Sequence, residues 1–150
     1  MSGLRIRPLS RADLASVTRI DAHHTKARKP GYWKRVFADF LGRHSGHVRV
    51  GLAAEVDGRM AGYLLGEVRA FEFGSGPCGW IFAVGVDPLR LRLGVASALL
   101  AEACRVFRAA GVTTVRTMVR RNDVPVLAFF RSSGFSGGSY VQLERDAGAA

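Results

Sequence analysis

The stretch VGVDPLRLRLGVASALL, residues 84–100, decides the fold of this chain. It begins as an apolar strand that ends at Asp87-Pro88, passes through an arginine-rich turn, and continues from Gly94 as an apolar helix. Unpaired backbone N–H groups and the positive end of the helix dipole lie together at the start of such a helix. Gly94 allows close approach to the backbone, and Ala96 adds little bulk. The stretch therefore predicts a site for a phosphate or pyrophosphate carried by a small-molecule cofactor or ligand.

The length and composition indicate one globular domain spanning residues 1–150, with a substantial core. Hydrophobic residues make up 48% and charged residues 23%, which is normal for a soluble protein. No apolar run is long enough to cross a bilayer, and the N-terminus lacks the apolar core of a secretory leader. Cys78 and Cys104 are far apart and lack neighbouring metal ligands. We therefore expect a cytoplasmic protein with two reduced thiols and no metal.

The charge balance is strongly basic, with a net charge of +10 carried mostly by arginine. Such a charge either forms a binding face for nucleic acid or another polyanion, or reflects the amino-acid usage of a high-GC genome. The arginines are spread from Arg5 to Arg145 without a long run. This spacing favours a composition effect with a local anion site over nucleic-acid binding.

Hydrophobic periodicity predicts strands and helices along the whole chain, without a repeat or a long linker. A helix is expected after the Ser10 capping box, which Asp13 completes, and Asp57-Gly58 predicts a tight hairpin. The other expected helices are 33–41, 94–110 and 124–132, and the expected strands are 4–7, 48–56, 60–73, 80–86, 113–119 and 140–143. The order β-α-α-β-β-β-α-β-α-β describes an α/β domain with a mixed sheet flanked by helices.

The residues around Gly94 also have a specific spacing. Val86-Asp87-Pro88 closes the strand, and Gly94 and Ala96 follow at the start of the helix. With this spacing and order of elements, the chain resembles the GNAT superfamily of acyl-CoA-dependent N-acetyltransferases over nearly its whole length. It departs at Leu91, where the family has arginine or glutamine. Because the family holds the pyrophosphate largely by main-chain amides, the resemblance implies that binding survives this change.

A second block, near the C-terminus, strengthens the resemblance. The family runs from an asparagine through an apolar helix to Gly-Phe, and here Gly134-Phe135 follows such a helix. Counting back from Gly134 places Asp123 at the asparagine position and Phe130 where many members carry a tyrosine. The resemblance implies a GNAT-like sheet in which two parallel strands, 80–86 and 113–119, splay apart around the pantetheine arm of acetyl-CoA.

The resemblance further implies a donor site and a reaction in which a primary amine attacks the thioester of acetyl-CoA directly. The donor-site residues that it implies are Val84, Gly85, Val86, Arg92, Leu93, Gly94, Val95, Ala96, Ser97, Asp123 and Phe130. Acetyl-CoA is the acyl donor, and no metal is needed. The expected partners are acetyl-CoA and an amine acceptor, either a small molecule or a protein. A homodimer is allowed, and neither a membrane nor nucleic acid is expected.

Candidates for the acid and the base come from the residues themselves. Glu67 interrupts an apolar strand beside the acetyl-CoA strand, where a carboxylate could take the amine proton directly or through water; otherwise it lies on a solvated face. Phe130 has no hydroxyl, so Tyr140 could protonate the leaving thiolate in its place, or be an ordinary residue of the last strand. His23 and His24 could line the acceptor pocket or lie at a helix end.

We therefore predict an acetyl-CoA-dependent N-acetyltransferase. A non-catalytic acyl-CoA-sensing or interaction module is the alternative that Phe130 suggests, and a basic nucleic-acid-binding protein is the one that the net charge suggests. Release of CoA thiol in the presence of an amine separates the enzyme from the sensing module. Salt-sensitive binding of nucleic acid without CoA would identify the third class.

Overall fold

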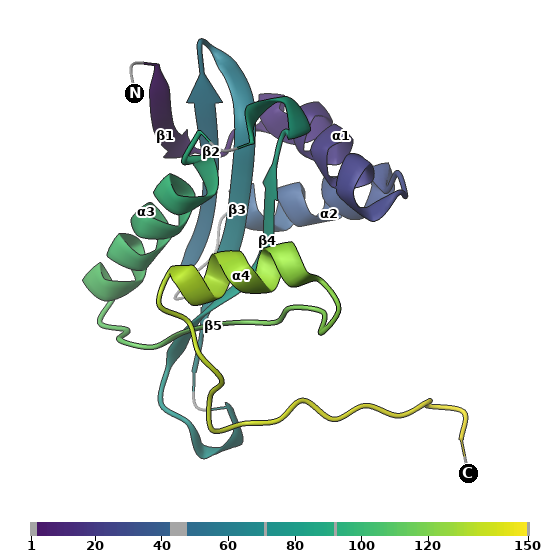
Figure 1. The fold of residues 1–150 in the computed structure, drawn as a ribbon, viewed down its shortest axis with the longest axis vertical. Coiled ribbons are helices and arrows are strands. Elements are labelled where there is room, and N and C mark those ends of the chain that lie inside the picture. Colours follow the sequence, from purple (N-terminus) through teal and green to yellow (C-terminus); the bar gives the residue numbers. More distant parts are fainter. Residues whose placement is uncertain (1–2, 43–47, 71, 92, 150) are drawn as a thin grey trace. The chain divides into compact units, whose positions relative to one another are not determined.

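The computed structural model describes residues 3–42, 48–70, 72–91 and 93–149 (Figure 1). They form two compact units, Met1–Met118 and Val119–Ala150, each described by itself. The first unit contains β1 (Leu4–Pro8), α1 (Leu14–Thr25), α2 (Pro30–Leu41), β2 (Arg49–Val56), β3 (Arg59–Arg69), β4 (Cys78–Val86), α3 (Val95–Ala109) and β5 (Val115–Thr117). The second unit contains α4 (Val124–Ser132). None of the helices within the described ranges is long and apolar enough to cross a membrane.

The five strands of the first unit form one sheet in the order β1-β2-β3-β4-β5. The pairs β1–β2, β2–β3 and β3–β4 are antiparallel, whereas β5 runs parallel to β4. Asp57 and Gly58 both have positive φ, as a two-residue hairpin turn requires, and they join β2 to β3 where the sequence predicts the hairpin. α3 provides the crossover that a parallel pair needs. The predicted α/β class, with a mixed sheet flanked by helices, is confirmed.

Helices cover both faces of this sheet (Figure 1). Tyr63 and Leu65 of β3 lie in a buried cluster with side chains of α1 and α2, such as Ile20 and Trp33. Because side chains alternate along a strand, Gly62, directly before Tyr63, faces the opposite side, where α3 packs. The α1–α2 face and the α3 face therefore have separate cores.

Two glycines let α3 lie close to the sheet. A Cβ atom on Gly79 of β4 would lie 2.6 Å from Cδ2 of Phe107, and one on Gly62 of β3 would lie 2.8 Å from Cγ1 of Val95. Both helix residues are almost completely buried. Phe107 and Val95 therefore fix the two ends of α3, and Val95 is the first residue of the helix. This packing sets the position of the turn that precedes α3.

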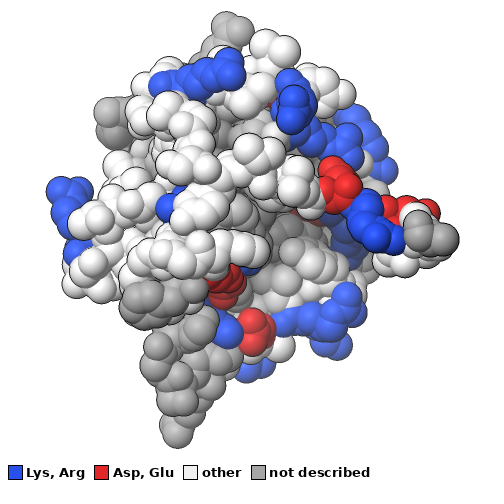
Figure 2. Space-filling model, turned by 90° about the horizontal axis from the view of Figure 1, so that it is seen from below, with Lys and Arg blue, Asp and Glu red and all other residues white. Residues whose placement is uncertain are grey.

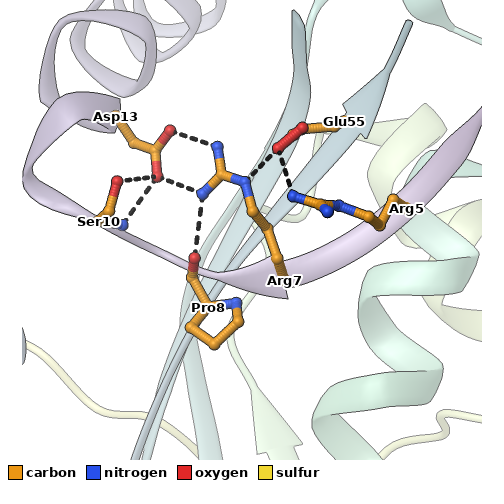
Figure 3. A network of polar contacts seen from close by, with 6 residues as sticks. All are labelled: Arg5, Arg7, Pro8, Ser10, Asp13 and Glu55. Atoms are coloured by element: carbon orange, nitrogen blue, oxygen red, sulfur yellow. Dashed lines mark hydrogen bonds and ion pairs between the residues drawn. The ribbon is translucent and has the colours of Figure 1, made fainter. Parts of the chain in front are cut away.

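A polar network ties β1 to the start of α1 and to β2 (Figure 3). The Arg7 guanidinium donates to both oxygens of Asp13, at 2.7 and 2.8 Å, and also to Glu55. Asp13 accepts a 2.8 Å hydrogen bond from the backbone N–H of Ser10, as the predicted capping box requires. Burial raises the pKa of Asp13, but the hydrogen bonds from Arg7 and Ser10 outweigh it, so the net pKa is lowered.

Three predicted strands differ from the structure most, whereas the others agree to within two residues at each end. The strand expected at 60–73 ends at Arg69, and the one expected at 113–119 is reduced to Val115–Thr117. The strand expected at 140–143 is wrong, because these residues form no strand in the second unit.

The physical reason is that apolar alternation shows only that a segment is compatible with a strand. A strand also needs a neighbour to pair with its backbone. Val141 and Leu143 are 76% and 88% exposed, and Tyr140 is 52% exposed, so these alternating side chains are not buried as those of a sheet strand are. The interpretation of Tyr140 as a sheet residue is corrected accordingly.

Candidate active site

The site begins where β4 extends beyond β5. β5 pairs only with Gly79, Trp80 and Ile81, whereas β4 continues to Val86. Within the described ranges no strand pairs with this edge of β4 beyond Ile81. The register against β3 shifts at the same point and leaves Phe82 without a partner, as in a β-bulge. The first unit therefore has an open strand edge at residues 82–86, between the two parallel strands in which the sequence predicts the gap.

The hydrogen bonds of β4 reveal which polar groups face this open edge. The N–H of Asp87 donates to the Ala61 carbonyl of β3 at 2.8 Å. Because the orientation of main-chain groups alternates along a strand, the N–H and C=O groups of Val84 and Val86 point away from β3, to the open edge. Gly85 points its polar groups to β3, and a Cβ there would lie 2.7 Å from the Tyr63 ring. Val84 and Val86 therefore offer an extended ligand two sets of backbone donors and acceptors.

The end of α1 reaches this edge through His24. Its Nε2 lies 2.6 Å from the Val86 carbonyl oxygen, and because a carbonyl only accepts, the imidazole donates from Nε2. An ion pair of 3.2 Å between Arg19 and Asp87 also joins α1 to the end of β4. The sequence suggested a role for His24 on the acceptor side, but no local pattern could reveal a contact with a residue so distant along the chain.

The turn after β4 is shaped by Asp87 and Gly94. Asp87 accepts a 2.9 Å hydrogen bond from the Leu89 N–H. Burial raises the pKa of Asp87, but the bonds from Leu89 and Arg19 outweigh it and lower the pKa overall. Gly94 has φ +75°, in the left-handed region that glycine tolerates, and is the N-cap of α3.

Three successive amides follow at the start of α3. The first helical hydrogen bond runs from the Ala98 N–H to the Gly94 carbonyl. The N–H groups of Val95, Ala96 and Ser97 therefore have no acceptor within the helix, and glycine has no side chain to cap them. Leu93 directly precedes Gly94. The prediction for Arg92 lies outside the described residues. The arrangement suits an anion.

Glu67 lies at the opposite end of the open edge. In the sheet register it stands opposite Trp80, one residue before the last pair of β4 with β5. Alternation from Leu65 places it on the face covered by α1 and α2. Its Oε1 lies 3.4 Å from Nε of Arg69, whose guanidinium lies 4.8 Å from the centre of the Trp80 ring. With 22% of its side chain exposed, Glu67 is a partly buried carboxylate rather than a fully solvated one.

The remaining predicted site residues belong to the second unit. Asp123 is the N-cap of α4 and accepts a 3.3 Å hydrogen bond from the Val126 N–H. Phe130 is 5% exposed and packs against Phe129 and Phe135, with ring centres 5.1 and 5.0 Å away. Tyr140 lies in the extended segment after α4.

Basic side chains do not gather into one patch on the face shown in Figure 2, where acidic and uncharged side chains lie between them. Among the described residues, no group of three or more His, Cys, Asp or Glu side chains is placed to hold a metal ion.

The mixed sheet, the open edge of β4 and the glycine turn before α3 define a class of acyltransferase folds. The model of the acetyltransferase (GNAT) family matches residues 14–135, so the chain belongs to this family. The resemblance found in the residues around Gly94 and Gly134 is confirmed.

Curated relatives match part of the chain. The mycothiol acetyltransferase of Clavibacter michiganensis is 34% identical over 84 residues, which are 56% of this chain and 26% of the relative. That of Saccharomonospora viridis is 32% identical over 87 residues, covering 56% of this chain and 28% of the relative. The matched region thus spans little more than a quarter of the length of these relatives.

Solved structures share the fold across almost the whole chain. The aminoglycoside N-acetyltransferase AAC(6')-Iy, in complex with CoA, has a TM-score of 0.82 at 17% identity and covers 96% of this chain and 95% of its own. The ribosomal-protein-alanine N-acetyltransferase of Brucella melitensis has a TM-score of 0.76 at 16% identity, covering 96% and 99%. At these identities, the similarity establishes the fold.

Proposed function

We propose that this protein is an N-acetyltransferase that transfers the acetyl group of acetyl-CoA to a primary amine by direct attack. The observation that carries the proposal is the continuity of the open β4 edge with the uncapped amides of α3. One stretch of main chain thereby offers hydrogen-bonding groups for an extended arm and, next to them, an anion site. Acetyl-CoA combines an arm containing two amides with a pyrophosphate in this order.

The donor site is assigned to these two features. The pantetheine amides pair with Val84 and Val86, with Gly85 between them, and the pyrophosphate accepts hydrogen bonds from the N–H groups at the start of α3. The donor-site residues in the proposal, Arg92, Asp123 and Phe130 included, are those that the family resemblance implies. The arm then runs from the turn toward Phe82, a span of about 13 Å at the usual strand rise.

In the proposal this direction points the thioester toward the end of the β4–β5 pairing, where Glu67 stands opposite Trp80, two residues beyond Phe82. We assign to Glu67 the removal of the amine proton, directly or through water, so that the free amine attacks the thioester carbonyl. The C–N bond forms as the C–S bond breaks, the CoA thiolate leaves, and the nitrogen gives up its second proton to the thiolate or to water. Tyr140 is assigned the protonation of the thiolate, which otherwise leaves unprotonated, since a thiol ionises partly near neutral pH.

The acceptor is proposed only as an amine. Proteins similar to this chain carry names that refer to mycothiol, aminoglycosides and a ribosomal-protein alanine, so their acceptors differ in size and chemistry. A cytoplasmic location, where acetyl-CoA is available as the donor, and a homodimer are proposed together with this function.

An amine panel with detection of the released CoA thiol tests this function. We expect thiol release that depends on both acetyl-CoA and at least one amine. Binding of acetyl-CoA without turnover on any amine would instead identify the sensing module.

A further inference from the structure

The contact between His24 and Val86 has a consequence for the donor site. Val84 and Val86 are the two residues of the open β4 edge whose main-chain groups point away from β3. They supply two N–H donors and two C=O acceptors, and the Val86 carbonyl already accepts the 2.6 Å hydrogen bond from His24. One of the four groups that would pair with an extended ligand is therefore in use.

We propose that His24 caps the open edge of β4 and that the pantetheine arm of acetyl-CoA displaces it from the Val86 carbonyl on binding. This inference rests on the proposed function. A carbonyl oxygen has two lone pairs, so the competition is for space: the imidazole, with its Nε2 2.6 Å from the Val86 oxygen, lies against the open edge where an extended ligand would run. The cap satisfies an edge carbonyl in the free protein and must be exchanged for an amide N–H of the ligand.

The surroundings of His24 allow this exchange without unfolding of α1. His24 is exposed and lies in the last turn of α1, one residue before the helix ends at Thr25. The helix is held at other points, by the Arg19–Asp87 ion pair and by the hydrogen bond from Trp33 to Asp21. Rotation of one side chain is therefore enough to free the carbonyl.

The position of His24 along β4 indicates a role in donor binding rather than in proton transfer. Val86 is at the end of β4 that leads into the turn, whereas Glu67 stands at the other end of the open edge. His24 consequently faces the part of the arm next to the pyrophosphate rather than the thioester. Its removal should change binding of the donor and not the chemical step.

Calorimetry with two probes tests the proposal. CoA carries the pantetheine arm, whereas adenosine 3',5'-bisphosphate lacks it. For His24→Ala we expect CoA to bind about 2- to 10-fold more tightly, the equivalent of one net hydrogen bond. Binding of adenosine 3',5'-bisphosphate should not change. Thr25→Ala, which alters the same helix end but bonds only to carbonyls of Asp21 and Ala27, should leave both affinities unchanged.

Other outcomes would contradict the proposal that His24 caps β4, or the proposed function on which it rests. If the wild type binds CoA and His24→Ala binds it equally or more weakly, His24 does not compete with the arm. If the wild type does not bind CoA at all, the proposed function itself fails. A crystal structure of the wild type with CoA gives an answer that needs no variant: the Val86 carbonyl should accept from a pantetheine amide, and His24 still bonded to it would refute the proposal.

Discussion

Glu67 can be tested as the base by one isosteric substitution. Glu67→Gln keeps the shape of the side chain and removes its basicity, so kcat/KM should fall about 100-fold or more, with a changed pH profile. Glu72→Gln is the matched control, because Glu72 is also an ion-pair partner of Arg69, at 3.8 Å, but lies outside β3. Equal pH profiles for the wild type and Glu67→Gln would remove Glu67 from the mechanism.

Tyr140 is tested by removal of its hydroxyl alone. Tyr140→Phe should lower kcat while leaving KM for acetyl-CoA nearly unchanged, because a general acid acts in the step in which the thiolate leaves. The side chain is 52% exposed, so the melting temperature should stay within the error of the wild type. An unchanged kcat would mean that the thiolate leaves without help from this residue.

The turn before α3 can be tested by placing a negative charge on it. Gly94→Glu should abolish detectable binding of acetyl-CoA, because its carboxylate would stand at the start of α3, where we propose that the pyrophosphate binds. Gly111→Glu is a close control: this glycine follows the other end of α3, also has positive φ, and has open space around its Cβ position. Both variants carry a strain of about 1–2 kcal/mol in the left-handed region. A folded Gly94→Glu protein with wild-type affinity would place the anion site elsewhere.

The contact between α3 and β4 makes a separate prediction about stability. Gly79→Ala puts a Cβ 2.6 Å from a ring carbon of Phe107, which is fully buried and cannot move freely. The free energy of unfolding should fall by about 1–3 kcal/mol, as for other overpacked cores. Gly76→Ala meets nothing within 4 Å and should leave stability almost unchanged in denaturant unfolding. Equal stability of both variants would show that α3 can shift away from the sheet.

For the protein as a whole, the loss of stability at acidic pH should depend on the carboxylates of Asp13 and Asp87. The pKa of each is lowered in the folded state from an ordinary value of 3.8. A lowered pKa stabilises the fold above the unfolded-state value, and this contribution is lost as the pH falls through about 4 and below. The free energy of unfolding should therefore decrease from pH 5 to pH 3, and Asp13→Asn should reduce the slope. A slope equal to that of the wild type would contradict the role of the Arg7–Asp13 pair.

Much of the fold could be predicted because its signals are local. Ser10 with Asp13, Asp57 with Gly58, and the position of Gly94 each act within a few residues, and each is found in the structure as expected. The end of β3 at Arg69 and the lack of a strand at 140–143 depend on which neighbours are available for pairing. Local sequence does not contain this information.

The candidate site likewise has features that local sequence predicts and features that depend on distant neighbours. The amides that follow Gly94 are a property of one turn, so the sequence places them correctly. The hydrogen bond between His24 and Val86 joins residues that only the packing of α1 beside β4 brings together. The partnership of Glu67 with Arg69 and Trp80 likewise arises from the register of β3 and β4.

The use of main-chain groups on the open edge of β4 affects how such a protein can diverge. Every amino acid except proline carries the same backbone N–H and C=O, so substitutions at positions 84 and 86 leave the hydrogen-bonding groups of this edge in place. Substitutions on α1 and α2 change side chains and leave these main-chain groups unaltered. Under the proposed function, directed evolution toward another acceptor should therefore use libraries on α1 and α2 that keep Arg19 and His24, whose side chains contact the end of β4.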